Sequence, residues 1–389
     1  MSDTLAILVG GGPAPGINGV IASATIEAIN SGLRVVGIYD GYRDLAAGTP
    51  VKTTDLTLDV AARIQSSGGS YVRTSRTNPA KDAETLERTV RSLERLGARY
   101  LLCIGGDDTT FGAARIAERT AGRLGIATVP KTIDNDLPLP DATPTFGFET
   151  ARAVGAQIIE TLLEDARTTQ RWYIVVSMGR KSGSLALGMA SAAGATLAVI
   201  PEEFPDDTLD LAAVVERLSN AIVARYERGR LDGVAVVAEG IVERISAAEL
   251  DALENVSRDA YGHVRLADVP IGTLLRDRVR DRLKELGIDI TVLTKDIGYE
   301  VRCAKPIAYD IEYTRTLGYG AVRYLLGGGS GALIALASGR VQPVSLEELL
   351  DPRTGRIRTR QVEIDSDAYA AAQAGFIGAL HGAISHVRP

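Results

Sequence analysis

The stretch Tyr100-Leu-Leu-Cys-Ile-Gly-Gly-Asp-Asp-Thr-Thr110 indicates how the first half of the chain folds. Its apolar run, Tyr100 to Ile104, has the length of a buried strand, and a helical pattern extends from Thr110 to Arg123. The loop between them, Gly105 to Thr109, would therefore present its backbone N–H groups at a helix N-terminus, where an anion is favoured. The stretch predicts a phosphate-binding turn between a strand and a helix.

A second loop lies one strand-helix-strand step further along the chain. Pro130-Lys-Thr-Ile-Asp-Asn-Asp136 follows the short apolar run Ile126 to Val129 and carries two carboxylates, a hydroxyl and an ammonium group. Ligands of open α/β sheets bind beyond the carboxyl ends of the strands. We therefore expect this loop to contribute to a ligand site.

A third loop, Gly10 to Gly16, follows the first predicted strand and leads into a helix near Asn18. Glycine has no Cβ and tolerates positive φ, so this turn allows the backbone to approach an anion closely. Taken alone, the turn also fits an ordinary structural connection, and it matches neither the Walker nor the dinucleotide pattern. Asp40 stands where a ribose-binding acid would follow the second strand, which leaves a nicotinamide-binding alternative open.

Strand-like and helix-like segments alternate along most of the chain. The strand-like runs are Leu5–Val9, Val35–Ile38, Tyr100–Ile104, Ala127–Val129, Tyr173–Val176, Thr196–Ile200 and Val234–Ala238. The helix-like segments cover about Asn18–Ser31, Asp82–Leu96, Thr110–Arg123, Thr150–Thr168, Ser184–Ala193 and Leu209–Arg228. This spacing is typical of βαβ units and predicts an α/β fold with mainly parallel sheets.

A second strand-helix series begins at Trp172 and has its own glycine loop, Met178-Gly179-Arg180. We therefore predict two Rossmann-like lobes, residues 1–148 and 149–326, with the active site in the cleft between them. Residues 327–389 are expected to form a C-terminal strand, Ala332–Ala337, and helices that pack back on the lobes.

Composition narrows the class of protein. A chain of 389 residues that is 45% hydrophobic and 24% charged fits a globular enzyme, and its net charge of -6 argues against nucleic acid or an anionic membrane as a partner. The start lacks a basic leader and a long apolar run, so we expect a cytoplasmic location. The three histidines, His263, His381 and His386, fall outside every glycine-rich loop, which leaves acid-base chemistry to carboxylates.

Five motifs occur together in order: Gly10-Gly-Gly-Pro-Ala-Pro-Gly-Ile-Asn18, Gly105-Gly-Asp-Asp-Thr109, Pro130-Lys-Thr-Ile-Asp-Asn-Asp136, Met178-Gly-Arg180 and Gly298-Tyr-Glu-Val-Arg302. In order and approximate spacing they resemble the phosphofructokinase family, over about residues 4 to 326. The resemblance implies transfer of a phosphoryl group to the 1-hydroxyl of fructose 6-phosphate. Such an attack needs a base for the hydroxyl proton and neutralisation of the phosphate charge, and these loops carry both kinds of group.

The resemblance also assigns roles to individual residues. Asp134 is the implied base, and the other implied catalytic residues are Thr132, Asp136 and Arg180. Asp107 is the implied ligand of Mg²⁺, the expected cofactor. The implied diphosphate-binding residues are Gly11, Gly12, Arg76, Gly106, Asp108, Thr109 and Lys131. The implied contacts to the sugar phosphate are Arg171, Met178, Gly179, Glu239, Tyr299 and Arg302.

Two departures from the family pattern bear on the phosphoryl donor. ATP-dependent members typically have glycine where this chain has Asp108 and Lys131. A carboxylate at position 108 would obstruct the α-phosphate of a nucleotide, and an ammonium at position 131 would attract the two phosphates that remain. The diphosphate (pyrophosphate)-dependent 6-phosphofructokinases share this pair, so the resemblance implies diphosphate as donor. Diphosphate and a phosphate ester differ less in transfer potential than ATP and that ester do, so we expect a reaction that runs in both directions, with weak allosteric regulation.

Other interpretations of the same residues stay open. Tyr299 replaces a family histidine, which makes sedoheptulose 7-phosphate an alternative acceptor, and an ATP-dependent enzyme, an NAD or lipid kinase and a sugar-phosphate-binding regulatory subunit are further alternatives. In relatives, arginines equivalent to Arg171 reach a neighbouring subunit, so we expect a homodimer or homotetramer with shared active sites. Purely structural alternatives are a helix cap for Asp107, turn positions for Asp134 and Asp136, a solvated surface position for Arg171, a charged strand end for Glu239, and an Asp108–Lys131 ion pair.

Overall fold

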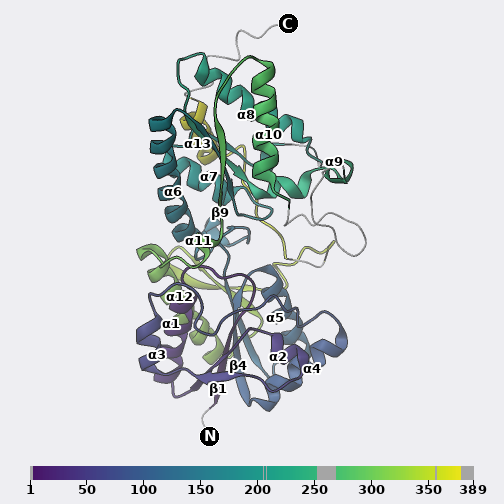
Figure 1. Ribbon diagram of the computed structural model, residues 1–389. Helices are drawn as coiled ribbons and strands as arrows, with labels where there is room; N and C mark the ends of the chain where they lie inside the picture. Colours follow the sequence, from purple (N-terminus) through teal and green to yellow (C-terminus); the bar gives the residue numbers. More distant parts are fainter. Residues whose placement is uncertain (1–2, 205, 207, 252–268, 355–356, 378–389) are drawn as a thin grey trace. The chain divides into compact units, whose positions relative to one another are not determined.

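The computed structural model describes residues 3–204, 206, 208–251, 269–354 and 357–377 (Figure 1). The three histidines of the chain, His263, His381 and His386, lie outside these ranges. The chain divides into two compact units: unit 1 comprises residues 1–151 and 299–360, and unit 2 comprises residues 152–298 and 361–389. None of the described helices is both long and apolar enough to cross a membrane.

Unit 1 is built on a seven-stranded sheet with the order β11-β10-β5-β4-β1-β2-β3. Its strands are β1 (Thr4–Val9), β2 (Arg34–Ile38), β3 (Thr53–Asp55), β4 (Ala98–Gly105), β5 (Gly125–Pro130), β10 (Ala332–Ala337) and β11 (Arg340–Ser345). The five central strands are parallel, and the edge strands β3 and β11 are antiparallel to their neighbours. The sheet is therefore mainly parallel, as predicted.

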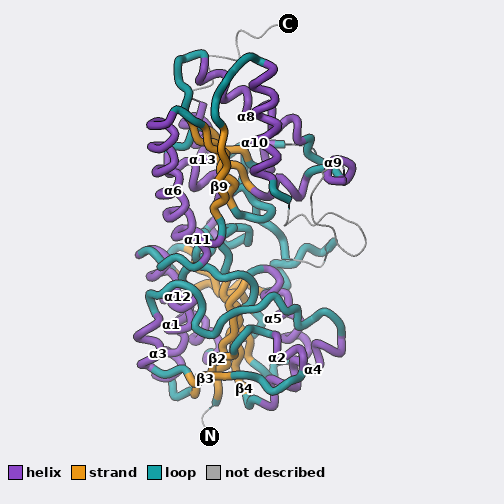
Figure 2. The backbone as a smooth tube through the Cα atoms, viewed as in Figure 1, coloured by secondary structure: helices purple, strands orange, loops and turns teal. Residues whose placement is uncertain are grey.

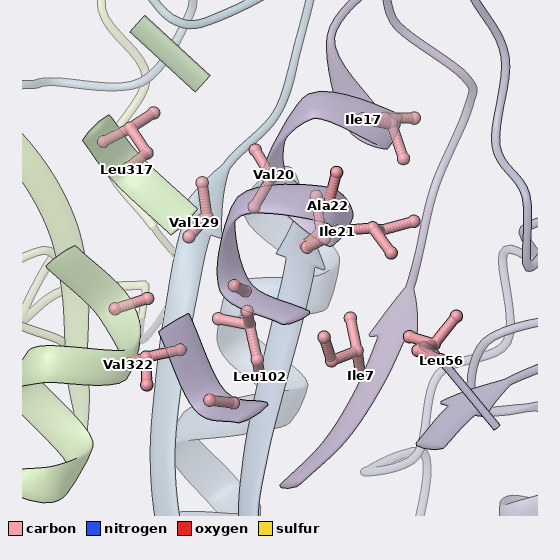
Figure 3. Packing of buried hydrophobic residues seen from close by; sticks show 14 of the residues in the cluster. Ile7, Ile17, Val20, Ile21, Ala22, Leu56, Leu102, Val129, Leu317 and Val322 are labelled. Atoms are coloured by element: carbon pink, nitrogen blue, oxygen red, sulfur yellow. The ribbon is translucent and has the colours of Figure 1, made fainter. Parts of the chain in front are cut away.

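Helices cover both faces of this sheet. One face carries α1 (Ile17–Asn30), α3 (Leu58–Ile64) and α12 (Ala308–Leu326), and the other carries α2 (Arg43–Ala47), α4 (Ala83–Arg95) and α5 (Asp107–Thr120). In Figure 3, Ile17, Val20 and Ile21 of α1 lie among Ile7 and Leu102 of the sheet. Leu317 and Val322 of α12 complete this fully buried cluster, so α12 forms part of the core of unit 1.

Unit 2 contains a four-stranded parallel sheet with the order β7-β8-β6-β9. Its strands are β6 (Trp172–Ser177), β7 (Leu197–Val199), β8 (Gly233–Ala238) and β9 (Val292–Ile297). The helices are α6 (Phe148–Thr169, which begins in unit 1), α7 (Ser184–Ala193), α8 (Leu211–Tyr226), α9 (Ala247–Asp251), α10 (Ile271–Glu285) and α13 (Asp367–Ile377). Figure 2 shows the strands of each sheet in orange between these helices.

The structure groups the chain differently from the predicted boundaries at one point. Residues 299–326, expected in the second lobe, belong to unit 1, because the apolar face of α12 packs on α1 and β5. The predicted strand Ala332–Ala337 is β10, which pairs in parallel with β5 in the same unit. The short helix α11 (Tyr299–Arg302) also belongs to unit 1.

Candidate active site

The three predicted loops of unit 1 meet where its strand order reverses. The neighbouring strands β1 and β4 are followed by connections that run to opposite sides of the sheet, toward β2 and β5. Such a switch point leaves an open crevice at the carboxyl ends of the strands, and ligands of α/β proteins bind there. The backbone N–H of Gly10 donates to Ile104 O (2.9 Å), and that of Gly11 donates to Ser75 O (2.8 Å). The second bond places the exposed Arg76 next to the first glycine loop.

Thr109 fixes the start of α5 against both strands. A Cβ atom at Gly10 would lie 2.3 Å from Thr109 Oγ1, and a Cβ atom at Gly105 would lie 2.3 Å from Thr109 Cβ and Oγ1. Only glycine leaves room for the buried threonine side chain at these two positions. The side chain of Thr109 therefore packs between these two glycines.

The helix α5 begins at Asp107, three residues earlier than the predicted start at Thr110. Gly106 is the N-cap residue, so the alternative that Asp107 caps this helix is wrong. Asp107 and Asp108 lie in the first turn, where the helix dipole favours negative charge. The first bond along the helix runs from Thr110 N to Gly106 O (2.9 Å), so the preceding amides lie at the N-terminus that the sequence assigns to phosphate.

Lys131 is a buried cation in the middle of these loops. Its side chain is 4% exposed, its Nζ donates a hydrogen bond to Gly12 O, and its backbone N–H donates to Gly105 O (2.9 Å). The pKa of Lys131 is lowered from 10.5 to about 8, mainly by burial and also by the charge of Arg302, although the carboxylates of Asp134, Asp107 and Asp136 act in the opposite direction. No ion pair joins Lys131 to Asp108 within the described residues, and Asp108 is exposed at the helix start. The alternative in which these two side chains merely pair with each other is therefore wrong.

Arg302 lies beside the first glycine loop. A Cβ atom at Gly12 would lie 2.0 Å from Arg302 Nη2, so this guanidinium occupies the space that a side chain at position 12 would need. Arg302 also stacks over the ring of Tyr299, 5.6 Å from its centroid, and Tyr299 is 80% exposed. The structure thus groups Arg302 with Lys131 in unit 1, together with the implied sugar residue Tyr299.

The acid loop, residues 131–136, is held by several hydrogen bonds. Asp134 N donates to Thr132 Oγ1 (3.0 Å), and Thr145 Oγ1 donates to Thr132 O (2.7 Å). Asn135 has a positive φ of 56°, and its side-chain oxygen accepts a bond from Thr145 N (3.1 Å). Asp134 and Asp136 are both buried, so this loop holds two carboxylates close to Lys131.

Sequence reasoning missed Arg360, which also contacts the acid loop. Its Nε donates to Asn135 O (3.0 Å), its Nη1 to Thr143 O (3.1 Å) and its backbone N–H to Asp136 O (2.7 Å). No local signal marks this arginine, because it lies 225 residues beyond Asn135 in a segment without a motif.

The carboxylates around Lys131 suit a hard divalent cation. Mg²⁺ is usually held by one or two protein carboxylates together with phosphate oxygens, and Asp107, Asp134 and Asp136, which all act on the charge of Lys131, could supply such oxygen ligands. Within the described ranges, no group of three or more His, Cys, Asp or Glu side chains is arranged to hold a metal ion by itself. The residues therefore fit a magnesium ion that the phosphate ligand helps to bind.

In unit 2, Glu239 organises the loop after β6. One oxygen of its carboxylate accepts hydrogen bonds from the backbone N–H groups of Gly179 (3.1 Å) and Arg180 (3.0 Å). Arg180 has a positive φ of 49°, a conformation that costs a non-glycine residue about 1–2 kcal/mol, and these two bonds offset that cost. Met178 starts the same loop, where its N–H donates to Ile297 O (3.0 Å). The carboxyl ends of β6, β8 and β9 thus bring together Met178, Gly179, Arg180 and Glu239.

Arg171 does not join that loop. It precedes β6, whereas Met178 follows it, so the six-residue strand separates the two residues by about 20 Å. Arg171 lies at the opposite end of the sheet, where the strands begin. Its side chain is one-third exposed, and its Nε lies 4.0 Å from Asp165 Oδ2. Within one chain, this arginine and the Met178–Arg180 loop cannot contact the same small ligand.

The structure argues against the nicotinamide-binding alternative, because Asp40 is not available to bind a ribose. The side chain of Asp40 is buried, and its Oδ2 forms ion pairs with Arg43 (2.6 Å) and Arg73 (3.7 Å). Both arginines neutralise the carboxylate, which gives it a structural role.

Comparisons with known proteins identify relatives of this chain. A sequence profile described as Phosphofructokinase matches residues 4–325. A protein of Thermotoga maritima named pyrophosphate--fructose 6-phosphate 1-phosphotransferase is 50% identical over 378 residues, which cover 96% of this chain and 90% of the relative. A protein of Naegleria fowleri with the same name is 46% identical over 379 residues, 95% and 87% of the two chains. The crystal structure of a pyrophosphate-dependent phosphofructokinase from Nitrosospira multiformis shares the fold, with a TM-score of 0.71 at 16% identity over 97% of this chain and 91% of that one.

Proposed function

The chain belongs to the phosphofructokinase family, and on that premise we propose that it transfers a phosphoryl group reversibly from diphosphate to the 1-hydroxyl of fructose 6-phosphate. The products are fructose 1,6-bisphosphate and phosphate. Two observations support this choice of donor. The buried ammonium of Lys131, at the start of the acid loop, bonds to the first glycine loop, and the carboxylate of Asp108 is exposed at the start of α5.

The acid loop supplies the base. Asp134 accepts the proton of the 1-hydroxyl as the sugar oxygen attacks the nearer phosphorus of diphosphate, and the bond from that phosphorus to the bridging oxygen breaks to release phosphate. Thr132 accepts a hydrogen bond from Asp134 N, which fixes the loop around the base. Asp136 adds the second carboxylate, and Arg180 in unit 2 is the proposed contact to the transferring group.

Cationic groups must balance the charge of diphosphate. We assign this role to Lys131, with Arg76 at the edge of the glycine loop and the backbone N–H groups at the start of α5. Gly11, Gly12 and Gly106 allow the backbone to approach the ligand. A magnesium ion held by Asp107 and the diphosphate oxygens would stabilise the negative charge that develops on the leaving phosphate.

Diphosphate is preferred because the site combines repulsion of one donor with attraction of the other. ATP must pass its α-phosphate and nucleoside beyond the β-phosphate, and the charge of Asp108 opposes that third phosphate. Diphosphate ends before this position and needs only the cations around Lys131. Because diphosphate and a phosphate ester differ little in transfer potential, the reaction runs in both directions.

The position of Arg171 supports an active site shared between subunits. Arg171 lies at the edge of its sheet opposite to the Met178–Arg180 loop and Glu239, to which we assign fructose 6-phosphate. It can contact a sugar phosphate in the site of a second copy of the chain, so we propose a homo-oligomer in which neighbouring copies contribute residues to one site.

A donor comparison tests this function. Purified protein is incubated with fructose 6-phosphate and Mg²⁺, first with diphosphate and then with ATP, and fructose 1,6-bisphosphate is measured. We expect rapid product formation with diphosphate alone, and a fall in kcat of about 100- to 10,000-fold for Asp134→Asn. Turnover with ATP and none with diphosphate would refute the assigned donor, and full activity of the Asp134 variant would refute the assigned base.

A further inference from the structure

Arg360 bonds to the acid loop through both its side chain and its backbone. The guanidinium donates to Asn135 O, to Asn135 Oδ1 and to Thr143 O, and the backbone N–H of Arg360 donates to Asp136 O. Asn135, which lies between Asp134 and Asp136, therefore accepts hydrogen bonds from Arg360 at both its carbonyl and its side chain. All of these groups belong to unit 1.

The acid loop needs such support for physical reasons. Its two buried carboxylates repel each other, and Asn135 between them adopts a left-handed conformation with φ of 56°. A guanidinium has a planar fork of donors, so it can bond several acceptors at once and fix their relative positions. Burial lowers the pKa of Arg360, whereas Asp136 and Tyr313 raise it, so this cation interacts with the carboxylate of Asp136 as well as with the carbonyl groups of the loop.

We propose that Arg360 is a positioning residue for phosphoryl transfer: it holds Asn135 and Asp136 so that the carboxylate of Asp134 meets the sugar hydroxyl in the reactive geometry. This inference rests on the proposed function, because it assigns Arg360 a role in the step for which Asp134 is the base. A displacement of reacting groups by about 1 Å costs on the order of 100-fold in rate, so a residue that only fixes the loop can control kcat.

A neighbouring arginine provides a matched control. Arg358 lies two residues earlier in the same segment, but its guanidinium donates to Glu348 O and its backbone N–H donates to Leu349 O (3.0 Å). Loss of the Arg358 side chain therefore weakens the attachment of the segment without removing a contact to the acid loop.

The test compares Arg360→Ala, Arg360→Lys and Arg358→Ala with the wild type in the diphosphate assay. We expect Arg360→Ala to lower kcat by about 10- to 100-fold with less than a 3-fold change in KM for either substrate. Added guanidinium chloride at millimolar concentration should restore part of the lost kcat, because it replaces the missing group. Arg360→Lys keeps the charge without the fork and should be intermediate, and Arg358→Ala should keep more than half of the wild-type kcat.

An equal loss of kcat in Arg358→Ala, or an Arg360→Ala variant with wild-type kcat, would overturn the proposal. Hydrogen exchange of residues 132–137 gives a readout that does not depend on activity: we expect these amides to exchange at least about 10-fold faster in Arg360→Ala than in the wild type. Unchanged exchange would overturn the positioning role. A wild type inactive with diphosphate would refute the proposed function, and hydrogen exchange would then report on the loop contacts separately.

Discussion

Lys131 is the residue on which the choice of donor depends most. Its ammonium is buried, and burial makes the charged form costly, although three carboxylates act in the other direction. A pKa of about 8 means that the side chain is charged below that pH and becomes neutral as the pH rises through it. The attraction for diphosphate is therefore present at neutral pH and lost in mild alkali.

This behaviour predicts an alkaline limb in the pH profile of kcat/KM for diphosphate. The limb should have a midpoint near pH 8, because kcat/KM reports the free enzyme. In kcat the limb should move to higher pH, because bound diphosphate stabilises the charged lysine. Lys131→Arg removes the titrating group and keeps the charge, so the alkaline side of its profile should show only the ionisation of diphosphate itself. Identical profiles for the two proteins would contradict the assignment.

For individual residues, the sequence predicted which motif residues lie close together, but it did not predict the distant residues that bond to their loops. Gly12 follows β1, and Lys131 and Asp134 follow β5; these parallel strands flank β4, so their carboxyl ends lie at the same end of the sheet. Arg360 contacts the same loop from a distant segment, and only the tertiary fold brings it there. The hydrogen bonds that Glu239 accepts from the backbone N–H groups of Gly179 and Arg180 were likewise not expected, because a residue at a strand end gives no indication of which loop its side chain contacts.

At the scale of elements, the junction of β1, β4 and α5 depends on one threonine and two glycines. We expect Gly10→Ala to lower the free energy of unfolding by about 1–3 kcal/mol, since the new methyl group must displace Thr109 Oγ1. The double variant with Thr109→Ala should recover much of this loss, because the atoms in the way are removed. Chemical denaturation measures both effects.

Two further glycine variants, Gly105→Ala and Gly375→Ala, serve as controls for this prediction. Gly105→Ala should not be rescued by Thr109→Ala, because its methyl group would lie 2.3 Å from Thr109 Cβ, which alanine retains. Gly375→Ala meets no atom within 4 Å and should not destabilise the protein. Equal rescue of both glycine variants would show that the clash with Thr109 does not control this junction.

The positions of helices and strands could be predicted from the spacing of apolar residues in the sequence, whereas their division between the two units could not. The predicted helix Ser184–Ala193 and strand Ala332–Ala337 match α7 and β10, because their apolar patterns and flanking glycines mark the ends. The start of α5 differed because the polar residues Asp107 to Thr109 resemble a loop, although acidic residues also stabilise a first helical turn. The membership of α12 in unit 1 depends on which apolar face it meets, and a single sequence does not reveal that partner.

At the scale of the whole molecule, the separation of Arg171 from the Met178–Arg180 loop predicts complementation between two inactive variants. In a shared site, Asp134 of one copy works with Arg171 of another. Co-expression of Asp134→Asn and Arg171→Ala chains should then give hybrids in which some sites contain both wild-type residues. A random mixture should show about a quarter of the wild-type activity, because each intact site needs two independent wild-type contributions.

Each variant expressed alone provides the baseline for this experiment. Mixed oligomers that are no more active than the average of the two separate proteins would contradict shared sites. Sedimentation of the wild type as an active monomer would contradict them as well.

The proposed activity with diphosphate depends on donor selection by Asp108 and Lys131. The most direct test is the ratio of kcat/KM for diphosphate to kcat/KM for ATP, measured with fructose 6-phosphate and Mg²⁺ in the wild type and in Asp108→Gly/Lys131→Gly. We predict a ratio far above one in the wild type and a fall of at least about 100-fold in the double variant, mainly through weaker use of diphosphate. An unchanged ratio in the double variant would contradict donor selection by these two side chains.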